Sequence, residues 1–341
     1  MRYSKLIGSL LAAACSVVAF AQSSVIERVN PIIGTNGMGH TFPGACVPFG
    51  LVQLSPDTDT IPHNVDGKYQ PRAYEYCAGY QYKDSSIVGF SHTHFSGTGH
   101  SDLGDILIMP TTGALKLNPG TATNPDGGYR SRYSHNTEVS KPGYYEVLLS
   151  DYGVKAQLTT TQRVGVHKYT YPAQAKEQRI ILDLIHGIYN YDGKVLWASL
   201  RVENDTLLTG YRITNGWART NYTYFAISFS KPIVHYGCEE KAKVNYRGGY
   251  GKFNMKENFP DIGGRKIVAY FEFDPKASQE LEVKVALSGV STAGALKNLQ
   301  AEAASAGFDE LASRASNTWN KALSVIEANG NDDPVSYTHL R

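Results

Sequence analysis

Apolar and polar residues alternate with a period of two along much of the second half of the chain. The segments that begin at Val154 and Val164 show this alternation, which is typical of half-buried strands. Similar runs occupy residues 179–184, 196–202, 206–213, 222–229, 266–273 and 281–287. Turn pairs such as Asp192-Gly193 and Asn215-Gly216 separate them. No helix-length periodic segment lies between the runs, so the pattern predicts a mainly β protein, a large antiparallel β-sandwich.

Helical spacing replaces the alternation near the C-terminus. Apolar residues there recur every three or four positions, with a break at Gly307. We expect two helices that link the sandwich to something larger. The predicted organisation is a sandwich domain at 22–290, a helical linker at 291–330 and a short tail at 331–341.

The first residues resemble a secretory signal. A basic stretch with Arg2 and Lys5 precedes an apolar run that ends in Ala19-Phe20-Ala21, a small-x-small cleavage pattern. The run is too short to span a bilayer comfortably, and no later segment is long and apolar enough to do so. We expect residues 1–21 to be removed and the protein to be exported to the periplasm or beyond. A lipid anchor at Cys15 is disfavoured because the apolar run continues past it.

Composition agrees with a turn-rich β protein. Charged residues are only 19% of the chain, and it contains 33 glycines and 23 tyrosines. Without Arg2 and Lys5 the 33 basic residues fall to 31, equal to the 31 acidic ones. A neutral chain without a basic cluster is a poor candidate for nucleic-acid binding. Cys46, Cys77 and Cys238 then remain, and either one disulfide with a thiol or three thiols is possible.

The densest polar segment spans residues 89–105. If it begins as a strand, His92 and His94 point to the same face. Together with His100 and Asp102 they could bind zinc or iron. Imidazole and hydroxyl groups on a glycine-rich loop also suit sugar hydroxyls, since each can donate or accept a hydrogen bond. A purely structural hydrogen-bond network is the third interpretation.

Two further segments have unusual compositions. Residues 30–57 are rich in glycine and proline, which indicates either a loop of fixed shape that positions something or a demanding crossover between strands. Residues 74–82 are rich in aromatics, which stack on sugars or, more commonly, pack in a core. Trp197 and Trp217 are expected to pack in the core or against turns. No Gly-x-Ser-x-Gly motif occurs, which disfavours that type of serine hydrolase.

Taken together, four motifs resemble the N-terminal region of glycoside hydrolase family 92, the calcium-dependent exo-α-mannosidases. They are Asn30-Pro-Ile-Ile-Gly-Thr35, the stretches 39–45 and 48–57, Cys77-Ala-Gly-Tyr80, and residues 89–110. The resemblance covers roughly residues 26–290. It implies an N-terminal β-sandwich, linking helices and a C-terminal (α/α)6 barrel, with the active site between the two domains. It also implies cleavage of terminal α-linked mannose with inversion, by a general acid and a carboxylate base.

The resemblance places the acid, the base and most calcium ligands in the barrel, which we expect to be missing from the 341 residues given. No catalytic residue and no metal ligand is therefore assigned here, and calcium is expected only for the full-length enzyme. The implied partners are mannose-containing glycans and the chain's own C-terminal barrel. The chain is expected to be an N-terminal fragment, inactive alone, whose last residues look like a truncated or misread end.

The resemblance also implies which loops face the cleft between the domains. The candidate sugar-facing or supporting residues are His40, Thr41, His92, His94, Ser96, Thr98, His100 and Asp102. Tyr76 lies where family members often carry an aromatic residue for the leaving-group sugar. Two alternatives from other classes stay open: a free-standing carbohydrate-binding β-sandwich, and a metal-dependent enzyme that uses His92, His94 and His100.

Overall fold

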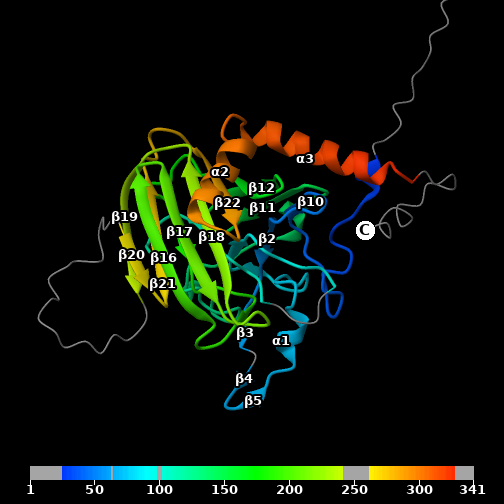
Figure 1. Cartoon of the computed structure of the whole chain (residues 1–341), viewed down its shortest axis with the longest axis horizontal. Helices are drawn as coiled ribbons and strands as arrows, with labels where there is room; N and C mark the ends of the chain where they lie inside the picture. The colour runs from blue at the N-terminus through cyan, green and yellow to red at the C-terminus, as the bar shows by residue number, and fades with distance from the viewer. Residues whose placement is uncertain (1–24, 63, 98–101, 241–260, 327–341) are drawn as a thin grey trace, which may run out of the picture.

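The structure, a computed structural model, describes residues 25–62, 64–97, 102–240 and 261–326. Two large sheets face each other, and two helices lie over one of them (Figure 1). All neighbouring strands within each large sheet run antiparallel. The mainly β, antiparallel sandwich predicted from the alternation is confirmed.

The seven-stranded sheet has, in spatial order, β1 (Ala45–Cys46), β2 (Gln53–Asp57), β7 (Gly89–Ser91), β8 (Leu107–Thr111), β14 (Gln178–Asp183), β21 (Ile267–Phe273) and β19 (Ile233–Glu240). The nine-stranded sheet has β10 (Val139–Lys141), β11 (Tyr144–Leu149), β12 (Val154–Thr160), β13 (Val164–Thr170), β22 (Glu280–Ser288), β18 (Asn221–Phe229), β17 (Leu207–Thr214), β16 (Val195–Asn204) and β20 (Asp261–Gly264). Short pairs join β3 (Ile61–Pro62) with β15 (Tyr189–Asn190), β4 (Asn64–Val65) with β5 (Lys68–Tyr69), and β6 (Ser86–Ile87) with β9 (Ser131–Arg132). The helical elements are η1 (Val25–Arg28), α1 (Arg72–Glu75), η2 (Pro125–Gly127), η3 (His135–Thr137), α2 (Thr292–Glu302) and α3 (Phe308–Leu323).

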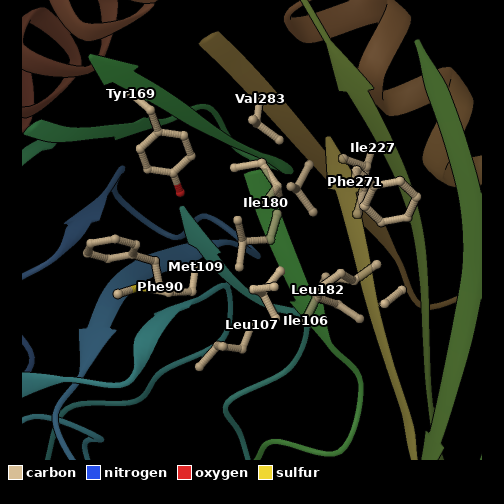
Figure 2. Packing of buried hydrophobic residues seen from close by; sticks show 14 of the residues in the cluster. Phe90, Ile106, Leu107, Met109, Tyr169, Ile180, Leu182, Ile227, Phe271 and Val283 are labelled. Atoms are coloured by element: carbon tan, nitrogen blue, oxygen red, sulfur yellow. The ribbon is translucent and has the colours of Figure 1, made fainter. Parts of the chain in front are cut away.

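The core fills the space between the two sheets. Leu281, Val283 and Val285 alternate along β22 and are buried toward the seven-stranded sheet. They meet side chains such as Leu182 of β14 and Phe271 of β21 (Figure 2). Alternate burial on one strand is what a period of two produces when one face meets the core. The predicted strands therefore owe their positions to this single apolar interior.

Polar contacts fix the helices to the outer face of the nine-stranded sheet. The Lys284 ammonium of β22 donates to the carbonyls of Ala303, at 2.8 Å, and Ala306, at 2.7 Å. Carbonyls at the end of a helix have no partner within the helix, so these bonds complete the end of α2. The Glu302 carboxylate accepts from the Arg163 backbone N–H at 2.8 Å. The corner between α2 and α3 is thus held by the sheet itself.

Helix α3 continues from this corner across the sandwich to the first strand. The Trp319 indole N–H donates to the Cys46 carbonyl of β1 at 2.6 Å. Phe308, Leu311 and Ala315 are buried on one face of α3, at the spacing that the sequence indicated. The two predicted linker helices are therefore present and pack on the sandwich.

Some expectations lie beyond the structure, and several strands, β19 among them, escaped prediction. The signal at residues 1–21 and the tail at 331–341 lie outside the described residues, and the domain limits stay predictions. Strand β19 has no clear alternation because it is at the edge of its sheet, where Val234 is exposed. Within the described ranges, no helix has the length and apolarity to cross a membrane. None of Cys46, Cys77 and Cys238 forms a disulfide with another.

The interior predicts unequal costs for two leucine truncations. Leu182→Ala opens a cavity between the sheets, and we expect the free energy of unfolding to fall by about 3 kcal/mol. Leu148→Ala is the matched control, because this β11 side chain is 37% exposed. Its cost should be about 0.5 kcal/mol or less. Urea denaturation followed by circular dichroism measures both, and similar losses would contradict the assigned core.

Candidate functional site

Several separate segments meet around the carboxylate of Asp57, at the end of β2. Asp57 is fully buried. Its Oδ1 lies 2.8 Å from His94 Nε2 and its Oδ2 lies 2.7 Å from His186 Nε2. The Ser91 hydroxyl donates to Oδ2 at 2.6 Å. One side chain therefore joins β2, the end of β7, the loop after it and the segment after β14.

Charge explains why this carboxylate tolerates burial. Burial alone would raise the pKa of Asp57, but the imidazoles of His94 and His186 hold that pKa well below its ordinary value. His94 Nδ1 lies 2.8 Å from the Gln53 carbonyl, so both ring nitrogens of His94 face acceptors. Both must carry protons, and the ring is an imidazolium paired with Asp57. Gly79 allows the approach, since a Cβ there would lie 2.1 Å from Asp57 Oδ1.

A second buried chain of hydrogen bonds starts at His92. His92 Nδ1 donates to the Ile106 carbonyl at 2.6 Å, and its Nε2 lies 2.9 Å from His167 Nε2. His167 Nδ1 lies 2.7 Å from the Tyr169 hydroxyl. The bonds are all satisfied when Tyr169 donates to His167, and His167 to His92, with both rings neutral. Burial lowers the pKa of His92 to about 4 and lowers that of His167 as well, which agrees with this arrangement.

His92 and His94 therefore lie behind the surface, and neither can touch a sugar. The expected common face is not formed because β7 ends at Ser91, before the two histidines. Their ring nitrogens bind different partners in the protein interior. Of the two roles expected for them, sugar-facing or supporting, these contacts agree with support of the loop. Within the described ranges, no three His, Cys, Asp or Glu side chains are grouped closely enough to hold a metal ion.

Among the described candidate residues, His40 has a buried polar atom without a hydrogen-bond partner. Its ring is buried edge-on against Tyr74, with centroids 4.7 Å apart, and its carbonyl accepts from the Gly97 N–H at 2.7 Å. Its Nε2 has no hydrogen-bond partner in the described structure. Burial lowers the pKa of His40, which favours the neutral ring. A buried imidazole nitrogen without a partner is costly, and a ligand hydroxyl would satisfy it.

The backbone at His40 is also unusual. Its φ of +51° lies in the left-handed region, which non-glycine residues rarely occupy. Thr41 follows and donates its hydroxyl to the Ile33 carbonyl at 3.0 Å. The glycine-rich segment therefore folds back on itself and fixes the ring of His40. This supports the interpretation that the segment positions something.

The other predicted residues fall in different environments. Tyr76 is only 1% exposed, and its hydroxyl donates to the Asp84 carboxylate, so a sugar-stacking role for it is corrected to a packing role. Ser96 is exposed and lines an apolar cavity of about 200 Å³ beside Trp319. Thr98 and His100 lie outside the described residues.

Asp102 positions a residue that the sequence analysis misjudged. It accepts from the backbone N–H of Trp217, and a Cβ on Gly216 would lie 2.0 Å from its Oδ1. The Tyr191 hydroxyl donates to the Asn215 carbonyl at 2.6 Å. Trp217 is held in this turn with 78% of its surface exposed, so its expected packing role is wrong. An aromatic residue directly after an Asn-Gly turn, outside any apolar pattern, was the available signal.

Buried cations lie beneath the same loop and were also missed. Arg212 is fully buried, and its Nη2 lies 3.0 Å from Asp105 Oδ1. Lys194 is 1% exposed. Burial and the neighbouring Arg212 lower the pKa of Lys194 to about 8. The positive charges stabilise the ionised carboxylate of Asp105 and so brace the loop from below.

A larger cleft lies on the other side of His186. It has a volume of about 790 Å³, and its walls include Asp59, Arg130, His186, Tyr191 and Lys266. The size suits a small ligand, and the lining offers hydrogen-bond donors and acceptors. The Arg130 guanidinium is already paired with Asp59 at 3.1 Å. The cleft therefore offers polar ligands hydrogen-bonding groups next to an arginine whose charge is already paired.

The sandwich is similar to domains of known proteins over nearly its whole length. Residues 28–288 match the model of the glycosyl hydrolase family 92 N-terminal domain. A family GH92 alpha-mannosidase from Bacteroides thetaiotaomicron, solved with mannoimidazole, is 38% identical with a TM-score of 0.80, over 92% of this chain and 39% of that one. A family GH92 inverting mannosidase from the same organism is 25% identical with a TM-score of 0.73, over 94% of this chain and 39% of that one.

One curated relative is also similar. It is an uncharacterized secreted glycosidase from Arthroderma benhamiae, 24% identical over 91% of this chain and 39% of its own length. The chain thus spans about two fifths of the length of the relatives it matches.

The buried carboxylate predicts a strong effect of a neutral replacement. Asp57→Asn keeps the size of the side chain but leaves the imidazolium of His94 unpaired. We expect the free energy of unfolding to fall by about 3 kcal/mol or more. Asp126→Asn is the control, because that carboxylate pairs with Arg132 on the surface. Urea denaturation should show no measurable change for the control, and equal losses would refute the role of Asp57.

The neutral histidine pair predicts a loss of stability in mild acid. The unfolded chain takes up protons near pH 6.5, whereas folded His92 does so only near pH 4. The contribution of His92 to the free energy of unfolding should therefore be fully present above pH 6.5. It should fall by about 1.4 kcal/mol per pH unit as the pH drops toward 4. Urea denaturation between pH 7 and pH 5 measures the slope. His167→Gln removes one of the two neutral rings and should make the slope shallower; an unchanged slope would exclude the pair as its source.

Proposed function

The chain belongs to glycoside hydrolase family 92, and from this premise we propose that it forms the sugar-facing wall of a secreted, exo-acting, inverting α-mannosidase. The observation that carries the proposal is the unpartnered Nε2 of His40 on a conformationally fixed loop. The similarity to two mannosidases supports mannose as the sugar. The expected partners are mannose-containing glycans.

The proposed share of the chain in the reaction is recognition. Inversion needs an acid that protonates the leaving oxygen and a base that activates water on the opposite face of the ring. No described residue is assigned either role. His40 would accept or donate one hydrogen bond to a sugar hydroxyl, with Thr41, Ser96 and Asp102 shaping the loops around it. The acid and base would come from a C-terminal barrel, and the chain alone would be inactive.

Calcium fits the complete enzyme better than this chain. Calcium prefers six to eight oxygen ligands, with carboxylates among them. The described part of the chain has no group of three acidic or other metal-ligating side chains. We propose, from the family resemblance, that most ligands lie in the C-terminal barrel. When bound, the ion would help to hold the hydroxyls of the terminal sugar.

A free-standing carbohydrate-binding domain is the second candidate. The polar cleft of about 790 Å³ beside His186 favours it, because this cleft needs no second domain to be complete. In this alternative the chain binds glycans and cleaves none. Export is proposed in both cases from the signal-like first residues, with a lipid anchor at Cys15 the less favoured form.

The test compares the 341-residue chain with the product of the source gene, sequenced beyond codon 341. We expect only a product with a C-terminal barrel to release mannose from α-mannosides. Proton NMR should show the β-anomer first, and removal of calcium with EGTA should abolish release. An α-anomer first, or full activity in EGTA, would overturn the proposed mechanism. A stop codon after Arg341 with glycan binding by the chain would establish the second candidate.

A substitution tests the part given to His40. In the active product, His40→Ala should lower kcat/KM by about tenfold, the effect of one lost hydrogen bond. His135→Ala is the matched control, because both ring nitrogens of His135 are bonded within the protein, to Glu138 and Tyr82. An equal change in the two variants would remove His40 from the site.

A further inference from the structure

The outer face of the nine-stranded sheet is only partly covered by helices. Helix α2 packs over Ala226 of β18 and Ala286 of β22. Farther along β18, away from α2, Tyr222 is 45% exposed, and on β16 Trp197 is 42% exposed. Of the two expected positions for Trp197, in the core or against a turn, its exposure therefore excludes the core. These residues belong to a surface that the two helices leave open.

The strand register gathers aromatic side chains on this surface. Trp197 of β16 pairs with Ile213 of β17, which pairs with Tyr222 of β18. In the next row on the same face, Tyr211 of β17 pairs with Tyr224 of β18. Side chains two residues apart on a strand share a face, so both rows point outward together. We call Trp197, Tyr211, Ile213, Tyr222 and Tyr224 the aromatic face.

The tyrosine rings of this face contact one another. Tyr222 and Tyr224 are nearly parallel, with an angle of 10° between their planes and centroids 6.0 Å apart. The centroids of Tyr211 and Tyr224 are 5.8 Å apart. On β20, a Cβ at Gly263 would lie only 3.1 Å from Trp197 Cζ2, so the indole rests on the backbone of the neighbouring strand. The absence of a side chain at Gly263 lets this indole lie close to the sheet.

Polar groups border the rings on the same face. The Arg201 guanidinium lies 3.2 Å from Glu203 Oε2 and 3.4 Å from Asp261 Oδ2. Arg201 and Asp261 are largely exposed, so their hydrogen-bonding atoms face solvent. One guanidinium thus pairs with two carboxylates, which leaves the border a single net negative charge. An aromatic surface whose polar neighbours carry so little net charge suits an uncharged ligand rich in hydroxyl groups.

From these features we propose that the aromatic face is a binding platform for a chain of neutral sugars, separate from the site around His40. The apolar faces of pyranose rings would stack on Trp197 and on the paired tyrosines. Sugar hydroxyls would bond to the tyrosine hydroxyls and to the polar border. Three strands span about 10 Å, which gives room for more than one ring along the platform.

The position of the face favours a glycan over a following domain. Helix α3 leaves the sheet over β11, β12 and β13, on the side away from β16 and β20 (Figure 1). A polypeptide that continues from α3 therefore starts near the opposite edge of the nine-stranded sheet from the aromatic face. Contiguous exposed aromatics mark binding surfaces, whereas single ones are ordinary. The platform goes beyond the proposed hydrolase function, since binding here needs no second domain and no catalysis.

Affinity electrophoresis of the full chain in native gels tests the proposal. The gels contain α-mannan, glucomannan or xylan, and retardation gives the affinity. We expect at least one polysaccharide to retard the chain. The double variant Trp197→Ala and Tyr222→Ala should bind about tenfold more weakly or worse, and Trp197→Phe should retain most of the affinity. Far-UV circular dichroism confirms that each variant is folded.

Tyr69→Ala is the matched control, because it removes an exposed aromatic side chain from β5, outside both large sheets. It should leave retardation unchanged. If Trp217→Ala, in the turn beside Asp102, weakens binding as much as the double variant, the ligand lies at the candidate site and the platform is excluded. The proposal is also overturned if none of the three polysaccharides retards the chain. Size-exclusion chromatography adds one more decisive outcome: a dimer that the double variant converts to monomer would make the face a subunit interface.

Discussion

The buried carboxylate of Asp57 between two imidazoles is the interaction on which the candidate site depends. A charge removed from water is tolerated only where opposite charge and hydrogen bonds replace its hydration. His94 and His186 supply these from positions 37 and 129 residues away in the chain. The segments they belong to cannot separate without leaving a charge unpaired in a dry interior. Electrostatics thus fixes loops that have little regular secondary structure.

The sheet architecture was predictable because apolar and polar residues alternate along the central strands. Leu281, Val283 and Val285 show their common face without knowledge of what they pack against. Strand β19 lacked this signal because an edge strand with exposed residues mixes polar and apolar positions on both faces. The helices were predictable for the same local reason, and Gly307 marked the break between them.

The candidate site was predictable only as a set of segments. Sequence spacing placed His92 and His94 together, yet they serve separate networks because the strand ends before them. Tyr76 is buried while Tyr74 contacts His40, a difference that follows from the short helix α1, where alternation does not apply. Lys194 and Arg212 carried no local signal, since their role arises from charges that meet only in the folded chain. The exposure of Trp197 and Trp217 was not predictable either, because it depends on which surfaces the neighbouring elements leave uncovered.

The way α2 and α3 are attached has a mechanical consequence. Lys284 and Glu302 tie the corner between the helices to the sheet, and Trp319 ties α3 to β1. The helices therefore move with the sandwich as one body and do not form a hinge between it and whatever follows. A domain joined beyond Leu323 would start from a point that α3 holds at a fixed distance from the loop of His40.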